Sequence, residues 1–351
     1  MRKILKIMGI LLLCVILLAG LGLGVLTLTE YRPAAVEKIQ VTGRAAEKLP
    51  AGKTLRMLSW NTGYGALGAD ADFFMDGGTR VYTADEEKTR ENLAGIVAEL
   101  REQSPDLILL QETDKHSARS HFINQNEEYR AAFPGFESAF AHNFRALFVP
   151  YPLPPIGNVE SGLLTLSSFR ISDAERIALP CPFSWPVRTV NLKRCFLATR
   201  LPVEGSEKEL VLVNLHLEAY DDGEGKKKQM EQLAAFLAQE TEKGNWVIAA
   251  GDFNQTLADA MQAFPILDGE WTPGVLETGL LGENLTALMD PSAPTCRSLR
   301  RPYDGEREGF QFYMIDGIIV SDNVTVEEMH TLDRDFRYTD HNPVVLSFRL
   351  D

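Results

Sequence analysis

The sequence predicts an α/β protein in which a few helices pack on a pair of mixed β-sheets. Short apolar runs of strand length recur along the chain, several at hairpin-like spacing, whereas only two segments beyond the N-terminus have apolar residues at helical spacing. Many strands with few helices favour a layered α/β architecture. With 351 residues, 45% of them hydrophobic, the chain can bury one large core, so we expect one domain of about 300 residues.

The expected strands are short and mostly apolar, and they cover residues 54–60, 107–111, 162–166, 194–201, 210–217, 247–250, 315–320 and 344–348. A long connection rich in Gly and Asp, residues 63–83, separates the first strand from a helix that begins near Asp85. That helix presents Leu93, Ile96 and Leu100 on one face. A second helix, with Met230 and Leu233 on one face, lies between residues 217 and 247. Residues 107–111 are wholly apolar up to the last, so we expect this strand to be buried on both faces.

The N-terminus predicts a membrane anchor. Arg2, Lys3 and Lys6 precede residues 7–28, a run of 22 without a charge. At roughly 1.5 Å per helical residue this run spans about 33 Å, against a hydrocarbon core of about 30 Å. A cleaved signal peptide is the alternative, but its apolar region is usually only about 7 to 15 residues long. We expect residues 1–28 to anchor the protein, 29–53 to form a tether and 54–351 to fold outside the cytoplasm, because the positive flank stays inside.

Charge and cysteine content set further bounds. The net charge of −14 offers no broad attraction to phosphate polymers, although a divalent metal can supply local positive charge in an acidic cleft. Nuclease activity therefore stays open. Outside the apolar run the cysteines are Cys181, Cys195 and Cys296. A bridge between Cys181 and Cys195 and free buried thiols are both compatible with this number.

Polar residues follow six of the apolar runs, where a strand end would hold them over a cleft. They occur, in chain order, in Trp60-Asn61, Gln111-Glu112, Asn214-Leu215-His216-Leu217, Gly251-Asp252-Phe253-Asn254, Ile315-Asp316-Gly317 and Asp340-His341. This series resembles the endonuclease/exonuclease/phosphatase superfamily over about residues 54–349. The resemblance implies a four-layer α/β/β/α sandwich of the DNase I type and metal-dependent hydrolysis of phosphate esters.

Three residues are expected to bind the metal. A carboxylate at the end of a buried strand is costly to desolvate unless a cation or hydrogen bonds compensate it, which makes Glu112 the best ligand. The resemblance adds Asn61, through its neutral oxygen, and Asp340. Because these ligands are all oxygen, we expect Mg²⁺, with Mn²⁺ or Ca²⁺ as alternatives.

Five residues are expected to perform the catalysis. Asp252 would orient or deprotonate the attacking water, and Asn254 would donate a hydrogen bond to an oxygen of the phosphate. The resemblance pairs His341 with Asp316, which would fix the tautomer of the histidine. His216 would protonate the leaving oxygen or contact the phosphate. Which of His216, His341 and Asp252 is the base stays open.

Four further residues are candidates for substrate contact: Asn143, Asn158, Asn214 and Arg297. Two features depart from the abasic-site enzymes of the superfamily. Gly63 stands where those enzymes have a second acidic residue, which leaves a metal ligand there in doubt. The connection that contains Asp70, Asp72 and Asp76 has no counterpart in the motif series.

We therefore expect a membrane-anchored, extracytoplasmic phosphodiesterase or phosphomonoesterase with a divalent metal. The alternatives are a nuclease, a sphingomyelinase-like or phosphoinositide-directed lipid hydrolase, and an inactive tethered binding protein. The substrate would be a nucleic acid, a lipid head group or a small phosphodiester, and we expect no obligate protein partner. The aromatic loop at residues 183–186 and the anchor favour a target near the membrane.

Overall fold

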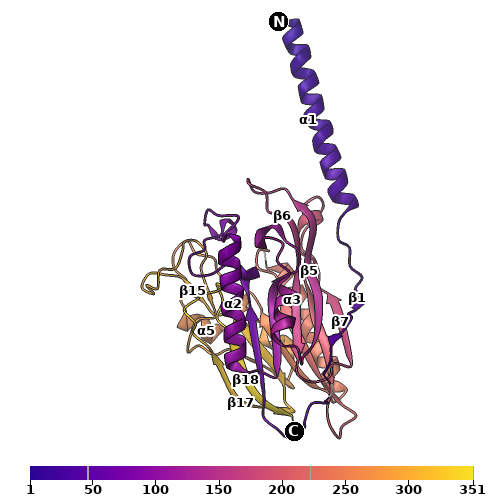
Figure 1. The fold of residues 1–351 in the computed structure, drawn as a ribbon, viewed down its shortest axis with the longest axis vertical. Helices are drawn as coiled ribbons and strands as arrows, with labels where there is room; N and C mark the ends of the chain where they lie inside the picture. Colours follow the sequence, from indigo (N-terminus) through magenta and orange to yellow (C-terminus); the bar gives the residue numbers. More distant parts are fainter. Residues whose placement is uncertain (46, 222, 351) are drawn as a thin grey trace.

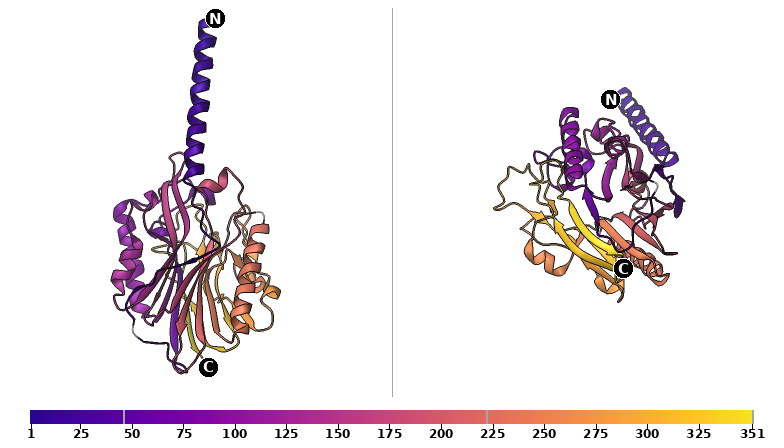
Figure 2. Two further views of the ribbon diagram at one scale, coloured as in Figure 1. Left: turned by 90° about the vertical axis from the view of Figure 1, so that its right-hand side faces the viewer. Right: turned by 60° about the horizontal axis from the view of Figure 1, so that its bottom comes forward.

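Two seven-stranded sheets pack face to face, and helices cover both outer faces. The computed structural model describes residues 1–45, 47–221 and 223–350. Figure 1 shows the ribbon with α1 projecting from one end, and the left view of Figure 2 shows the layers edge-on, with α2 and α4 on opposite sides of the two sheets. The four-layer α/β/β/α sandwich implied by the motif series is therefore confirmed.

The first sheet, sheet A, mixes parallel and antiparallel neighbours. Its strand order is β1-β7-β8-β9-β10-β16-β13, and only β9 and β10 are parallel. The strands are β1 (Val36–Lys38), β7 (Asp173–Ala178), β8 (Cys195–Pro202), β9 (Glu209–His216), β10 (Trp246–Asp252), β13 (Leu285–Leu288) and β16 (Asp316–Ser321).

The second sheet, sheet B, has the order β17-β18-β3-β4-β6-β5-β2, with β3 and β4 parallel. Its strands are β2 (Thr42–Gly43), β3 (Leu55–Asn61), β4 (Leu107–Asp114), β5 (Glu137–Val149), β6 (Gly157–Ser167), β17 (Val324–Thr331) and β18 (Val344–Leu350).

The helices beyond α1 (Arg2–Leu28) are α2 (Glu86–Gln103), α3 (Gln125–Ala132), α4 (Glu224–Glu242) and α5 (Ala258–Ala263). Two small ladders pair β11 (Gln255–Thr256) with β12 (Gly274–Val275) and β14 (Cys296–Arg297) with β15 (Phe312–Tyr313). Short 3₁₀ turns are η1 (Gly63–Gly65), η2 (Phe74–Asp76), η3 (Ala118–Ser120), η4 (Val187–Val190) and η5 (Thr278–Leu281). α2 begins where the sequence predicts, and its N-cap is Asp85, whose side chain accepts a hydrogen bond from Lys88 N.

Three apolar clusters hold the layers together. The largest fills the space between the sheets, one packs sheet A against α4, and one packs sheet B against α2 and α3. In β4, Leu107 and Leu109 face the first cluster and Ile108 and Leu110 face the third. The expectation that this strand is buried on both faces is confirmed.

A buried polar contact joins the two sheets just below the strand ends. Gln111 Nε2 donates to Asn214 Oδ1 at 2.8 Å, and Asn214 Nδ2 donates to Leu110 O and Leu164 O at 3.1 and 3.0 Å. Asn214 has no exposed surface. Its assignment to substrate binding is therefore wrong, because its amide already bridges the sheets.

The segment predicted as a tether, residues 29–53, is largely part of the domain. β1 pairs with β7 at one edge of sheet A, and β2 pairs with β5 at one edge of sheet B. Leu49 is fully buried in the core between the sheets. The prediction of a tether was wrong because the short paired stretches are only two or three residues long and have no periodic pattern. The connection between α1 and β1 is residues 29–35.

α1 projects from the domain, and none of its residues is buried. It is long and apolar enough to cross a membrane, a test that a signal sequence near an N-terminus also passes. Among the residues that the structure describes, the four cysteines are free thiols, so Cys181 and Cys195 are not bridged.

Candidate active site

Three of the expected catalytic residues lie in one row across the end of sheet A. β9 ends at His216 and β10 at Asp252, and these two are paired in the parallel register. Asp252 is also paired with Asp316, the first residue of the antiparallel β16. Position 251 requires glycine for this close pairing. A Cβ there would lie only 2.0 Å from Leu215 O, and the φ of Gly251 is +148°, a conformation that other residues rarely adopt. The alternation of strand direction thus brings residues from three distant segments together.

Sheet B brings Asn61 and Glu112 to the same end of the sandwich. β3 ends at Asn61, which pairs with Gln111 of the parallel β4. The register between β4 and β6 shifts between Leu110 and Thr113, and Glu112 has a φ of +54°. Such a bulge turns a side chain away from the regular alternation. Here the bulge places Glu112 in the lining of a pocket.

Asp340 and His341 enter the site from the loop before β18. Trp60 Nε1 donates to His341 O at 2.8 Å, and Arg297 N donates to Asp340 O at 3.0 Å. Thr339 Oγ1 donates to Asp340 Oδ1 at 3.1 Å. The loop is thereby fixed between β3 and β14.

These residues surround one pocket of about 250 Å³ between the ends of the sheets. Glu112, His216, Asp252, Asn254, Asp340 and His341 line it together with apolar and aromatic side chains from the surrounding loops. A small set of polar groups within an apolar lining is typical of sites that bind small ligands.

The two histidines differ in charge. His341 Nδ1 lies 2.8 Å from Asp316 Oδ2, as the motif series implies. Burial lowers the pKa of His341, but the negative charge of Asp316 outweighs this and raises the pKa well above its ordinary value. His216 Nε2 lies farther from its nearest carboxylate, at 3.4 Å from Asp252 Oδ2, and burial together with the charge of Arg194 lowers the pKa of His216 well below the ordinary value. The surroundings thus favour the charged form of His341 and the neutral form of His216.

Asp252 lies at the centre of the site. Its Oδ1 accepts from Asn254 N at 2.9 Å, and its Oδ2 lies 3.1 Å from Asn61 Nδ2, 3.4 Å from His216 Nε2 and 3.8 Å from His341 Nε2. Burial and the charge of Asp316 raise the pKa of Asp252 to about 7. A carboxyl group that titrates near neutral pH is suited to general base catalysis.

The donor set at the pocket fits a hard divalent cation. Burial and the charge of Asp340 raise the pKa of Glu112, and burial raises the pKa of Asp340. Both carboxylates line the same pocket, so a cation between them would relieve this cost. Oxygen ligands of this kind suit Mg²⁺ or Ca²⁺.

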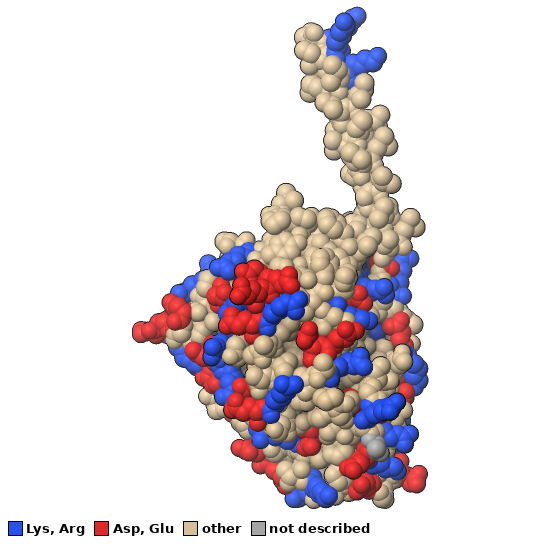
Figure 3. Space-filling model, viewed as in Figure 1, with Lys and Arg blue, Asp and Glu red and all other residues tan. Residues whose placement is uncertain are grey.

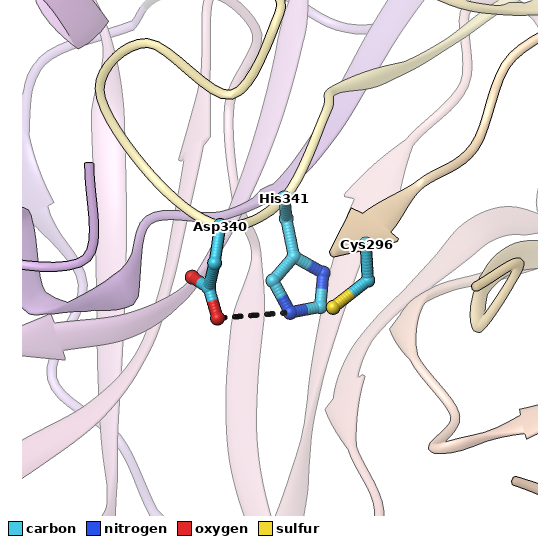
Figure 4. Close-up of side chains that lie close together, drawn as sticks. All are labelled: Cys296, Asp340 and His341. Carbon is cyan, nitrogen blue, oxygen red and sulfur yellow. Dashed lines mark ion pairs between the residues drawn. The ribbon is translucent and has the colours of Figure 1, made fainter. Parts of the chain in front are cut away.

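Cys296 also lies beside Asp340 and His341, as Figure 4 shows. Burial raises the pKa of its thiol to about 12, so the sulfur keeps its proton and is a poor ligand. A second cluster of Asp252, Asp316 and His341 has its histidine Nδ1 committed to Asp316. Glu112 and Asp340 therefore remain the better ligands.

Asn61 does not present the oxygen that was expected to face a metal. Its Oδ1 accepts from Gly63 N at 3.1 Å, while Nδ2 points to Glu112 Oε1 at 3.4 Å and to Asp252. In this orientation the amide holds the two carboxylates, and only its rotation would turn the oxygen toward a cation. Gly63 has a φ of +49°, and a Cβ there would lie 2.8 Å from Asp340 Oδ1. No side chain fits at that position, so it supplies no second acidic ligand.

The other proposed substrate contacts have mixed outcomes. Asn143 lines the pocket, whereas Asn158 lies outside it and donates to Ala146 O at 3.4 Å within the β5–β6 hairpin. Arg297 borders the pocket but is buried, and its guanidinium donates to Gly68 O at 2.6 Å and Ala71 O at 3.2 Å. The assignments of Asn158 and Arg297 to substrate contact are therefore not supported: Asn158 is not part of the pocket lining, and Arg297 stabilises the loop that follows η1.

The sequence analysis missed two arginines of the pocket lining, because neither belongs to a recognisable motif. Arg119 pairs with Asp114 at 2.9 Å and stacks 3.7 Å from the ring centre of Tyr64. Arg194 lies 3.5 Å from Glu218 Oε2. They come from a 3₁₀ turn and from the residue before β8, where the sequence carries no local signal for a cleft. Asp76, from the connection without a counterpart, also lines the pocket and accepts a hydrogen bond from Tyr220 Oη at 2.8 Å.

Comparisons with known proteins agree with this arrangement. The model of the endonuclease/exonuclease/phosphatase family matches residues 58–341. None of the curated proteins matches this sequence. Among solved structures, an endonuclease/exonuclease/phosphatase from Beutenbergia cavernae DSM 12333 has a TM-score of 0.60 at 17% identity, covering 85% of this chain and 72% of its own.

Two further structures have named activities or ligands. The human Nocturnin catalytic domain with bound sulfate has a TM-score of 0.52 at 19% identity, covering 89% of this chain and 97% of its own. ANGEL2, a 2′,3′-cyclic phosphatase in complex with adenosine-2′,3′-vanadate, has a TM-score of 0.55 at 14% identity, covering 90% and 99%. At such identities the likeness shows the fold alone. The family model, however, spans most of the chain, and the chain belongs to the endonuclease/exonuclease/phosphatase family.

Proposed function

We propose that the protein is a metal-dependent hydrolase of phosphodiesters. The observation that carries this proposal is the pocket in which His216, Asp252 and His341 meet Glu112 and Asp340 at the ends of both sheets. Two relatives of the same fold are described with a sulfate anion and with an adenosine vanadate, which resemble phosphate in shape and charge.

Asp252 is the general base in this proposal. Its pKa of about 7 makes the carboxylate available near neutral pH, and Asn61 and Asn254 fix both of its oxygens. The base that the sequence left open is therefore assigned to Asp252 rather than to a histidine. His341, held as a cation by Asp316, directs Nε2 toward Asp252 and Asp340 and donates a hydrogen bond to an oxygen of the phosphate. Neutral His216, whose Nε2 lies 3.4 Å from Asp252 Oδ2, also contacts the phosphate.

Glu112 and Asp340 would hold the metal ion, with Mg²⁺ as the preferred ion because the donors are oxygens. When bound, the cation supplies charge that stabilises the phosphoryl and leaving oxygens. Asn143, Arg119 and Arg194 are the polar groups of the lining best placed to contact the substrate beyond the reacting phosphate.

We propose further that α1 anchors the protein in the cell membrane and that the domain lies outside the cytoplasm, since the basic residues precede the apolar run. An uncleaved anchor predicts that the intact chain stays in membranes after an alkaline wash and that protease added outside intact cells digests the domain. Recovery of a soluble form that begins near residue 30 would contradict the anchor.

The hydrolase is tested with the full chain in detergent and Mg²⁺ on DNA, RNA, phospholipids, a chromogenic phosphodiester and a chromogenic phosphomonoester. We expect turnover of at least one diester, and we expect Asp252→Asn to lower it by about 10² to 10⁴-fold. A folded protein that hydrolyses none of them, or whose activity survives Asp252→Asn, would be better described as the tethered binding protein.

A further inference from the structure

An apolar cap covers the end of the domain from which α1 leaves. We define the cap by Leu147, Phe148, Tyr151 and Leu153 from the β5–β6 hairpin, Trp185 from the loop before η4, and Val187, the first residue of η4. Leu153 is 90% exposed, Tyr151 70%, Leu147 54% and Trp185 52%. On the face shown in Figure 3, the part of the domain directly beneath α1 is largely free of charged side chains, although Arg188, next to Val187, is exposed. Exposed apolar residues grouped in this way mark an interaction surface.

α1 is held against this cap. Trp185 Nε1 donates to Thr27 Oγ1 at 3.1 Å, in the last turn of the helix. Two residues beyond the helix, the buried carboxylate of Glu30 lies 3.4 Å from Arg188 Nε and 3.3 Å from Lys193 Nζ. The anchor and the cap therefore form one continuous surface, and a bilayer around α1 would meet the cap next.

The pocket lies at the same end of the domain. β3, β4, β9 and β10 all end there, and the β5–β6 hairpin extends beyond the pairing of Asp114 with Ser161. Ile156 at the base of the hairpin tip and Phe183 in the loop that contains Trp185 both line the pocket. The same two segments thus form the wall of the pocket and the cap.

We propose that the cap inserts into the surface of the bilayer that holds α1, and that the substrate is the phosphoester head group of a membrane lipid. The second part rests on the proposed hydrolase function. An apolar surface beside a membrane helix gains free energy by entering the interface, as amphipathic surface anchors do. With the cap inserted, the pocket opens at the level of the head groups, whereas a nucleic acid in solution would have to approach between the domain and the bilayer.

The position of the cap is measured with the full chain in lipid nanodiscs. Cys14→Ala and Cys181→Ser remove the exposed thiols, and an environment-sensitive fluorophore is attached at Leu153→Cys. Glu207→Cys is the matched control, because the exposed β8–β9 turn lies at the end of β9 opposite His216. We expect lipids with a quencher in the head-group region to reduce the emission at position 153 and not at 207. If the quencher reduced the emission equally at both positions, or at neither, the insertion would be overturned.

The substrate class is tested with the double variant Leu147→Ser/Leu153→Ser, by comparing its hydrolysis of lipids in vesicles with its hydrolysis of a soluble diester. Neither residue is part of the pocket lining. We expect hydrolysis of sphingomyelin, phosphatidylcholine or phosphatidylinositol phosphate in vesicles to fall about tenfold or more, since each side chain loses part of its transfer free energy. Turnover of a soluble chromogenic diester should not change. Val275→Ser, which removes an exposed apolar side chain outside the cap, should change neither.

The outcomes separate the two proposals. Hydrolysis of the soluble diester without hydrolysis of any vesicle lipid, or an equal loss on both by the double variant, overturns the lipid substrate and leaves the hydrolase in place. If neither the soluble diester nor a lipid is hydrolysed, the hydrolase fails and the lipid substrate fails with it, while quenching at position 153 still decides the insertion.

Discussion

The pair formed by Asp316 and His341 allows a quantitative test of the mechanism. Asp316→Asn keeps the shape of the side chain and removes its charge. Nδ1 and Oδ2 are 2.8 Å apart, and two charge centres roughly 4 Å apart interact by about 4 kcal/mol at an effective dielectric constant of about 20. Since about 1.4 kcal/mol is a tenfold change, loss of this stabilisation predicts a fall in kcat of about 10² to 10³-fold. His341→Ala should lower kcat by about 10² to 10⁴-fold.

The double variant distinguishes a coupled pair from two independent residues. If Asp316 acts by orienting and charging His341, Asp316→Asn should have little further effect in the His341→Ala background, because residues that act as a unit are not additive. The assay is kcat on the best substrate over a range of pH, with near-ultraviolet circular dichroism to show that each variant is folded. Two losses that multiply would refute the pairing, as would an unchanged pH profile in Asp316→Asn.

Three other predictions test the metal, the close packing and the pH dependence of stability. Chelation should abolish turnover, and Glu112→Gln should weaken Mg²⁺ affinity by about 10 to 100-fold or more in a titration of activity; full activity in excess chelator would exclude this role. Gly251→Ala should cost more than about 1 kcal/mol in urea denaturation, because its Cβ would lie 2.0 Å from Leu215 O, whereas Gly205→Ala, also at positive φ but in open space, should cost less. Although burial raises the pKa of Glu240, hydrogen bonds from Arg200, Lys243 and Asn245 outweigh this and lower it from 4.5 to about 2. The carboxylate therefore stabilises the fold fully above pH 4.5, and the difference in unfolding free energy between the wild type and Glu240→Gln should shrink as the pH falls toward 2.

The sequence predicted the core strands and the polar residues at their ends because both have local signals. The expected strands over 107–111, 210–217 and 247–250 lie within β4, β9 and β10 or extend one residue past them, and the polar residue that follows each apolar run does lie at the pocket. Burial of a strand requires apolar residues, and a cleft at its end requires polar ones, so the boundary between them is visible in the sequence.

Other elements could not be predicted for physical reasons. β5, β7, β13, β17 and α3 were missed: β5 and β17 mix buried and exposed residues without a strict alternation, and α3 is only eight residues long. Arg297 illustrates the limit at the site: the sequence suggested it as a substrate contact, but its four hydrogen bonds to backbone carbonyls depend on how residues 67–71 and Ser298 fold. Contacts between segments that are far apart in the chain leave no local pattern.

The length of the link between α1 and the domain determines what the pocket can reach. A free tether of 25 residues, from 29 to 53, would extend to at most about 90 Å and would let the pocket turn toward solutes in any direction. In the structure only residues 29–35 separate α1 from β1, a reach of at most about 25 Å. Glu30 shortens it further by its ion pairs with Arg188 and Lys193. If α1 spans a bilayer, the domain is therefore held close to the head groups, which is the condition that the proposed lipid substrate requires.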